Sequence, residues 1–152
     1  MKLSDICALP VAEIAHKDAA LFLWVTFPNL QEGLKVIKAW GFRYCTVAFT
    51  WVKRNKVSPS WFMGLGHWTR ANAEVCLLAT RGKPKRISKS VRQIVDTPIE
   101  RHSKKPDEVR DRIVTLMGDV PRIELFARDY TDGWDVWGNE VQGNIDLYAL
   151  AS

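Results

Sequence analysis

Two groups of hydrogen-bonding side chains each follow a short apolar run near the C-terminal end of the sequence. They are Arg128-Asp129-Tyr130, after the run at 123–127, and Asn139-Glu140, after the run at 134–137. A carboxylate or amide at the end of a strand can hydrogen-bond the diol of a nucleoside ribose. Two interpretations are open: both groups face one ligand, or each is only the polar end of a strand. The first predicts a nucleoside site.

The elements that must position these side chains alternate between strand-like and helix-like segments. We expect strands at 20–27, 43–53, 75–80, 92–98, 122–127 and 134–137, helices at 30–41 and 106–118, and a long loop at 54–73. The alternation predicts an α/β protein with a mostly parallel sheet, whose ligands bind beyond the carboxyl ends of the strands. The nearly continuous apolar run at 20–27 is typical of a strand buried on both faces. No glycine-rich phosphate loop follows any strand, so the ligand is nucleoside-like without a pyrophosphate cradle.

Positive charge is concentrated in three stretches of the chain, at 53–56, 81–92 and 101–105. Lys and Arg number 22 against 17 acidic residues, and residues 81–92 carry six of them with no acid. Aromatic residues lie among the basic ones between 51 and 70, and unpaired bases stack on aromatic rings. The alternative is a solvated, lysine-rich loop. The nucleic-acid interpretation assigns phosphate or base contacts to Lys53, Arg54, Lys56, His67, Trp68, Arg70, Arg81, Lys83, Lys85 and Arg86.

The composition argues against several other classes. No apolar run approaches the ~20 residues of a membrane span, so we expect no membrane segment. The three cysteines are widely spaced and the three histidines lie far apart, which argues against disulfides and a metal site. We expect Cys45 and Cys76 to be buried free thiols and the protein to be cytoplasmic.

Seven blocks of sequence are distinctive. They are LFLWVT (21–26), AWGF (39–42), WVK (51–53), GLGHW (64–68), EVCLLATRG (74–82), HSKKPDE (102–108) and IELFAR with GWDVWGNE (123–140). In this order they resemble the MT-A70 family of N6-adenine methyltransferases. That family includes the catalytic subunit of the eukaryotic messenger-RNA N6-methyladenosine writer and bacterial and phage DNA adenine methyltransferases. The compact loops and WDVWGNE are more similar to the bacterial and phage members.

The resemblance implies a permuted Rossmann-like methyltransferase fold over residues 1–152, with flanking helices and bound S-adenosylmethionine. Lys105 then reaches the methionine carboxylate, and Asn139 and Glu140 bind the ribose hydroxyls. The remaining cofactor contacts carried over from the family are Arg128, Tyr130 and Thr131. The last two depart from the family, whose members often have His and Asn there.

The family's catalytic tetrapeptide is absent, because the sequence contains no Pro-Pro. In Asp-Pro-Pro-Trp, the carboxylate and a proline carbonyl accept the hydrogens of the adenine amine, and the aromatic ring stacks on the base. These contacts orient the nitrogen for attack. The motif ends a central strand, expected between the strands at 20–27 and 122–127. We therefore assign no catalytic residue, and expect the domain to be N-terminally incomplete and its sheet completed by a missing segment or a second subunit.

Two functions follow. In the first, the chain is a truncated S-adenosylmethionine-dependent adenine methyltransferase acting on DNA rather than RNA, inactive by itself. In the second, it is a noncatalytic nucleic-acid-binding subunit that supports an active partner. The joint presence of the cofactor residues favours the first, because a degenerate enzyme need not keep them together. Those residues are Lys105, Arg128, Asn139 and Glu140.

Overall fold

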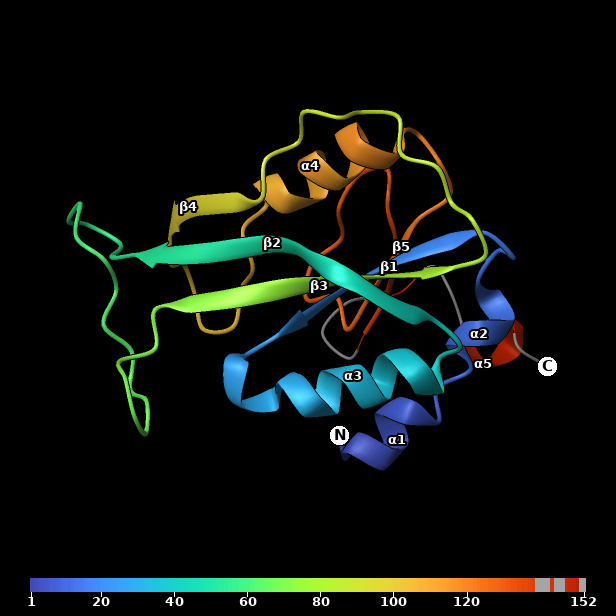
Figure 1. Ribbon diagram of the computed structural model, residues 1–152, viewed down its shortest axis with the longest axis horizontal. Coiled ribbons are helices and arrows are strands. Elements are labelled where there is room, and N and C mark those ends of the chain that lie inside the picture. The colour runs from blue at the N-terminus through green and yellow to red at the C-terminus, as the bar shows by residue number, and fades with distance from the viewer. Residues whose placement is uncertain (139–142, 144–146, 151–152) are drawn as a thin grey trace.

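The computed structural model describes residues 1–138, 143 and 147–150 (Figure 1). Its elements are α1 (Leu3–Cys7), α2 (Val11–Ile14), β1 (Ala19–Val25), η1 (Phe27–Asn29), α3 (Leu30–Ala39), β2 (Arg43–Arg54), β3 (Ala73–Arg81), β4 (Ile94–Pro98), α4 (Glu108–Met117), β5 (Ile123–Leu125), β6 (Asp135–Trp137) and α5 (Leu147–Leu150). Each strand and helix that the sequence pattern predicts is present, with bounds within a few residues of those expected. The pattern does not predict α1, α2 and α5, because four or five residues are too few to show a helical period.

The strands of the described residues form two sheets, one with the order β1-β3-β2-β4 and one pairing β5 with β6. Within the first sheet, β3 runs antiparallel to both β1 and β2, and β4 runs parallel to β2. The α/β class is confirmed, but this sheet is mixed rather than mostly parallel. The physical reason is the β2–β3 connection, which contains no crossover helix and returns the chain antiparallel beside the strand it has just left. The permuted connectivity stays a prediction.

Helices cover both faces of the four-stranded sheet. Figure 1 shows α1 and α3 on one side and α4 on the other. Successive side chains of β3 lie on opposite faces of the sheet. Leu77 packs in the hydrophobic cluster that includes Ile37 of α3, and Cys76 packs in the cluster that includes Val109 of α4. Gly33 lets α3 approach closely, since a Cβ there would lie 2.5 Å from Cγ1 of Val25. Among the described residues, no helix is long and apolar enough to cross a membrane.

Strand β1 is less buried than its apolar sequence predicts. All of its residues except Val25 are partly exposed. In the described part of the chain β1 pairs only with β3, and β5 pairs only with β6. Each of these two strands therefore has one edge without a strand partner among the described residues. They are the same two strands between which the sequence predicts the absent catalytic strand.

The two cysteines expected to be buried differ. Cys76 is fully buried, as predicted, but the prediction for Cys45 is wrong because this residue is exposed. Strand β2 extends well beyond β4, which pairs only with its last five residues. The ladder with β3 also shifts register at Cys45, between Tyr44 and Thr46. A thiol on this uncovered, irregular part of the strand remains open to solvent.

Candidate functional site

The carboxyl ends of three strands and the amino end of a fourth meet at one end of the sheet. Strands β1, β2 and β4 run in the same direction, because β1 and β2 are both antiparallel to β3 and β4 is parallel to β2. Glu74, the second residue of β3, therefore lies at the end where Trp24 and Lys53 complete their strands. Lys105, from the loop before α4, joins them by an ion pair with Glu74.

Glu74 bridges two lysines. Its Oε1 accepts a hydrogen bond from Nζ of Lys53 and its Oε2 accepts one from Nζ of Lys105, each at 2.7 Å. The residue is only 7% exposed, so its charge is shielded from water. Burial acts to raise the pKa of Glu74, but the hydrogen bonds and charges of the two lysines outweigh it and hold the pKa below its ordinary value. The carboxylate therefore stays ionised, and the group carries a net single positive charge.

Two tryptophan rings form the apolar side of this cluster. Trp24 and Trp51 pack edge to face with ring centroids 6.3 Å apart. Nζ of Lys105 lies 5.8 Å from the Trp24 ring centroid, and Nζ of Lys53 lies 5.0 Å from that of Trp51. Both distances fall within the range of cation–π attraction. We call these five residues the Glu74 cluster: Trp24, Trp51, Lys53, Glu74 and Lys105. A half-buried positive group between indole rings suits a small ligand with a carboxylate end.

Two segments that the sequence separates are in contact beside this cluster. The loop after β4 supplies Arg101, which forms an ion pair with Asp129 in the segment after β5. The Arg128 guanidinium donates a hydrogen bond to the main-chain carbonyl of His102. The structure thus joins the loop that carries Lys105 to the segment that carries Arg128. The resemblance to the MT-A70 family implies that these two residues contact one ligand, which stays a prediction.

Both contacting segments contain an unusual backbone conformation. Among the described residues other than glycine, those with positive φ are Ser103, at 63°, and Phe126, at 59°. A bulky aromatic residue rarely adopts this conformation, and such strain gathers at ligand-binding sites. Phe126 directly follows β5 and precedes Arg128 by two positions.

The ends of β5 and β6 lie side by side, which bears on the paired polar groups in the sequence. These strands are parallel, so their carboxyl ends share one edge. The main-chain nitrogen of Ala127 donates to the carbonyl of Trp137 at 2.9 Å. Gly138 must be a glycine, since a Cβ there would lie 2.4 Å from the carbonyl oxygen of Ala127. The predicted ligands Asn139 and Glu140 come next and lie outside the described residues.

The cofactor residues predicted just after Arg128 lie in the same edge segment. Tyr130 is largely exposed and Thr131 is partly buried. The main-chain carbonyl of Thr131 accepts a hydrogen bond from the nitrogen of Trp134, which closes the turn between β5 and β6. The assignment of cofactor contacts to these side chains stays a prediction.

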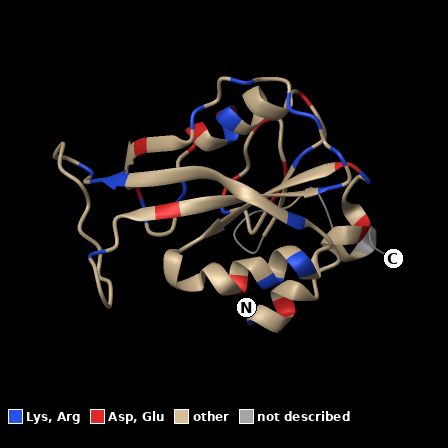
Figure 2. Cartoon of the chain, viewed as in Figure 1, with Lys and Arg blue, Asp and Glu red and all other residues tan. Residues whose placement is uncertain are grey.

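The predicted nucleic-acid residues do not form one surface. Lys56, His67, Trp68 and Arg70 lie in the β2–β3 loop, at the end of the sheet that holds the Glu74 cluster. The group that begins at Arg81 starts at the other end of β3, whose nine residues span about 26 Å. Figure 2 shows Lys and Arg both on the β2–β3 loop and along the segment from β3 to β4. That second group contains Arg81, Lys83, Lys85 and Arg86.

Three of these basic residues have intramolecular partners that the sequence did not suggest. Lys53 is held by Glu74, and the Arg81 guanidinium donates to the main-chain carbonyl of Ala12. Arg54 makes two hydrogen bonds to the carboxylate of Asp96, at 2.7 and 3.0 Å. The assignment of nucleic-acid contacts to the other basic residues stays a prediction.

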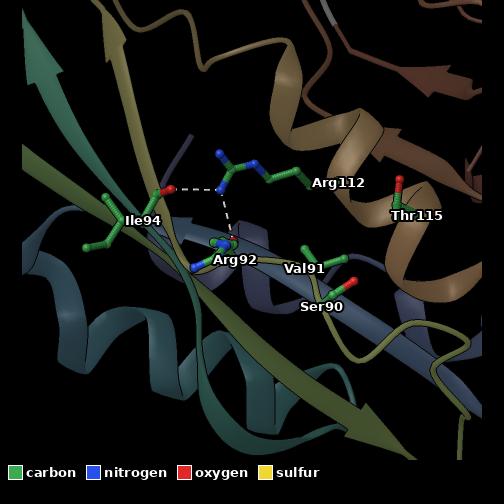
Figure 3. Close-up of a pocket in the computed structure, with 6 residues that line it drawn as sticks. All are labelled: Ser90, Val91, Arg92, Ile94, Arg112 and Thr115. Carbon is green, nitrogen blue, oxygen red and sulfur yellow. Dashed lines mark hydrogen bonds between the residues drawn. The ribbon is translucent and has the colours of Figure 1, made fainter.

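A cleft of about 290 Å³ lies between α4 and the segment leading into β4 (Figure 3). It is lined by Ser90, Val91, Arg92, Ile94, Arg112 and Thr115. The Arg112 guanidinium donates to the carbonyls of Arg92 and Ile94 and pairs with Glu108. These bonds tie α4 to the start of β4, so Arg112 has a structural role there. The cleft is at the opposite end of β4 from the Glu74 cluster.

Sequence reasoning missed Glu74 and Trp24 as site residues. The signal for Glu74 was present, because it is an acid at the start of an otherwise apolar strand, and a buried carboxylate requires a cationic partner. Within the described residues, no group of three or more His, Cys, Asp or Glu side chains is placed to hold a metal ion.

Comparison with known proteins gives consistent matches. A profile of the MT-A70 family matches residues 1–140. The Type II methyltransferase M.MunI of Mycoplasma sp is 36% identical over 146 residues, which cover 95% of this chain and 60% of that protein. The N(6)-adenosine-methyltransferase catalytic subunit METTL3 of Homo sapiens is 29% identical over 134 residues, covering 86% of this chain and 23% of its own length. The chain thus spans less than two thirds of the length of each of these relatives.

Proposed function

We propose that this chain, which belongs to the MT-A70 family, forms the cofactor-binding part of an S-adenosylmethionine-dependent N6-adenine methyltransferase that acts on DNA. One observation carries the proposal: the Glu74 cluster and the joined segments at 101–105 and 126–129 lie together at the carboxyl ends of strands. Ligands of α/β sheets bind at that edge. The resemblance to a type II methyltransferase favours DNA over RNA.

The charge of the Glu74 cluster fits the methionine end of the cofactor. In this proposal Lys105 pairs with the methionine carboxylate. An ammonium group has three donors, and Glu74 accepts one of them, so two remain for the ligand. The Lys105 side chain is 31% exposed, which leaves it accessible. Glu74 is then a positioning residue, since it fixes where the ammonium points.

The adenosine end is assigned to the segments after β5 and β6. The main-chain carbonyl of His102 fixes the Arg128 guanidinium, and Tyr130 and Thr131 follow it on the same segment. Asn139 and Glu140 would bind the ribose hydroxyls, following Gly138, which lies against Ala127. The bound cofactor supplies an electrophilic methyl group on a sulfonium. The residues of this chain hold and orient it.

In this proposal the amine of the target adenine takes its acceptors from an Asp-Pro-Pro-aromatic sequence, which does not occur among these 152 residues. We propose that this tetrapeptide comes from other polypeptide, either a further segment or a second subunit, and that its strand pairs with β1 and β5. Support comes from one edge of each of these two strands, which has no strand partner among the described residues. The chain alone would then not transfer methyl groups.

The test separates binding from chemistry. Calorimetric titration of the chain with S-adenosylhomocysteine should show binding that Lys105→Ala weakens about ten- to a hundredfold, because a charged hydrogen-bond partner is lost. Lys104→Ala is the matched control, since the Lys104 ammonium is paired with Glu100 and Asp107 instead. We expect it to change affinity less than about twofold. A folded chain that binds no S-adenosylhomocysteine contradicts the proposal.

The second candidate function is a noncatalytic nucleic-acid-binding subunit, which the missing tetrapeptide favours. Radioactive S-adenosylmethionine and adenine-containing duplex distinguish the two. We expect no label transfer by the chain alone, and transfer after addition of a polypeptide bearing a strand that ends in Asp-Pro-Pro-aromatic. Duplex binding without cofactor binding, and without rescue, would establish the noncatalytic subunit instead.

A further inference from the structure

The β2–β3 loop, residues 55–72, presents large apolar side chains to solvent. Trp68 is 99% exposed and Leu65 is 91% exposed. Other exposed apolar residues of the loop are Val57, Trp61 and Met63. Single exposed apolar residues are ordinary, but several together mark a binding surface. Figure 1 shows this loop extending away from the sheet as two bends, one near 55–61 and one near 64–71.

The second bend is held in shape by its backbone. The main-chain nitrogen of Gly64 donates to the carbonyl of Ala71 at 2.9 Å. A Cβ on Gly64 would lie 2.2 Å from that oxygen, and a Cβ on Gly66 would lie 2.0 Å from the carbonyl oxygen of Thr69. Only glycine lets the two arms come so close. The result is a narrow protrusion whose tip, residues 65–68, carries Leu65, His67 and Trp68.

The first bend is braced differently. The Arg54 guanidinium stacks over the Trp61 ring, 3.7 Å from its centroid, and donates to the carbonyl of Pro59. Asn55 donates side-chain hydrogen bonds to Ser60 and to the carbonyl of Trp61. Trp61 is therefore covered on one face by its own chain. The first bend supports the loop, whereas the apolar side chains at the second tip have no such cover.

Charge identifies the partner as a polyanion. No acidic residue occurs between positions 54 and 74, while Lys56, His67 and Arg70 lie beside the apolar side chains. The shape of the second bend is a protrusion, and apolar side chains on a protrusion act as wedges between base pairs. A groove that tracks a single strand would present its aromatic rings on a concave surface instead.

We propose that the tip of the second bend inserts into double-stranded DNA, with Leu65 as the wedge and Trp68 stacked on the base that the wedge exposes. Lys56 and Arg70 contact the flanking phosphates. This inference rests on the proposed function, because an adenine N6 inside a duplex is reachable only after the base leaves the stack. It makes a duplex the substrate and assigns the unstacking to this loop.

The test uses a duplex that carries 2-aminopurine beside one mismatch, which makes unstacking easier without the target sequence. The fluorescence of 2-aminopurine rises when it leaves the stack, so saturation with the chain should raise it. Leu65→Ser and Trp68→Ala should abolish most of the rise, and Trp68→Ala should weaken binding roughly five- to a hundredfold. Val57→Ser is the matched control, because Val57 is 99% exposed on the first bend. It should retain the rise.

Four results overturn the inference. Binding of the duplex without a rise in 2-aminopurine fluorescence contradicts the wedge, and so does an equal loss of that rise in Val57→Ser. Neither result affects the conclusion drawn from the titration with S-adenosylhomocysteine. Sedimentation could show that wild type is a dimer and that Leu65→Ser and Trp68→Ala are monomers. The tip would then be a contact between copies of this chain. Failure of wild type to bind any duplex at low salt overturns both the wedge and the nucleic-acid part of the proposed function. Equal melting temperatures of wild type and variants confirm that folding is unaffected.

Discussion

Replacing Glu74 with glutamine removes the charge at the centre of the candidate site and keeps the shape of the side chain. Glu74 is nearly buried and makes two ion pairs of 2.7 Å, with Lys53 and Lys105. A charged hydrogen bond contributes about 1.5–3 kcal/mol. Since the side chains of Lys53 and Lys105 are 20% and 31% exposed, each can turn partly to water. We therefore expect the free energy of unfolding to fall by roughly 2–4 kcal/mol in total.

The decrease in the free energy of unfolding caused by Glu74→Gln should depend on pH. The folded state lowers the pKa of Glu74 from its ordinary value of 4.5. The stabilisation by its charge is therefore fully present above that value and is lost as pH falls through the lower folded pKa. Urea unfolding of wild type and Glu74→Gln should show a large difference near neutral pH. That difference should shrink as the pH drops below 4.5.

The matched control is Glu100→Gln, which also removes a lysine partner. The Glu100 side chain is 53% exposed, so its pair with Lys104 should contribute less than about 1 kcal/mol. Glu74→Gln should also weaken S-adenosylhomocysteine binding, because Lys105 loses the contact that orients it. Equal stability of Glu74→Gln and wild type, or a penalty that is the same at acid and neutral pH, would refute this account of the cluster.

Three further predictions follow from the fold. Three basic residues of the β3–β4 segment can be neutralised together: Lys83, Lys85 and Arg86. If they contact phosphates, the slope of log affinity for duplex against log salt concentration should fall by about one unit per lost contact, as measured by fluorescence anisotropy. An unchanged slope would show that the segment is a solvated loop. Gly138→Ala should destabilise the β5–β6 edge by more than about 1 kcal/mol in urea unfolding, because its Cβ would meet the Ala127 carbonyl oxygen at 2.4 Å. Cys45 should react with a maleimide in the native protein, whereas Cys76 should react only after unfolding, since burial raises the pKa of its thiol to about 12.

Local patterns predicted the elements well because their causes are local. Helix α3 forms where apolar residues recur at helical spacing, and it ends at Ala39, two residues before Gly41, whose φ of 82° suits glycine. Helix α4 likewise begins just after Pro106 and ends before Gly118. Strand direction is different in kind. It depends on which strands pair, and pairing is decided by contacts between distant parts of the chain.

The same difference between local and long-range causes explains which contacts of the site residues could be predicted from the sequence. Lys53 and Arg54 lie in a basic run and looked available for phosphates, but their partners Glu74 and Asp96 are 21 and 42 residues away in the sequence. No local pattern links them. The resemblance to the MT-A70 family, in contrast, implied that Lys105 and Arg128 contact one cofactor, and the segments that carry them are in contact.

The antiparallel placement of β3, which the sequence pattern did not reveal, is what makes the Glu74 cluster possible. Strands β1 and β2 end at the edge where β3 begins. If β3 ran parallel to them, its first residues would lie at the far end of the sheet, and Glu74 would be about 20–25 Å from Lys53. The reversed strand instead brings Glu74 between Lys53 and Lys105. It neutralises one of two lysines there and leaves a single positive charge, in a fixed position, for an anionic ligand.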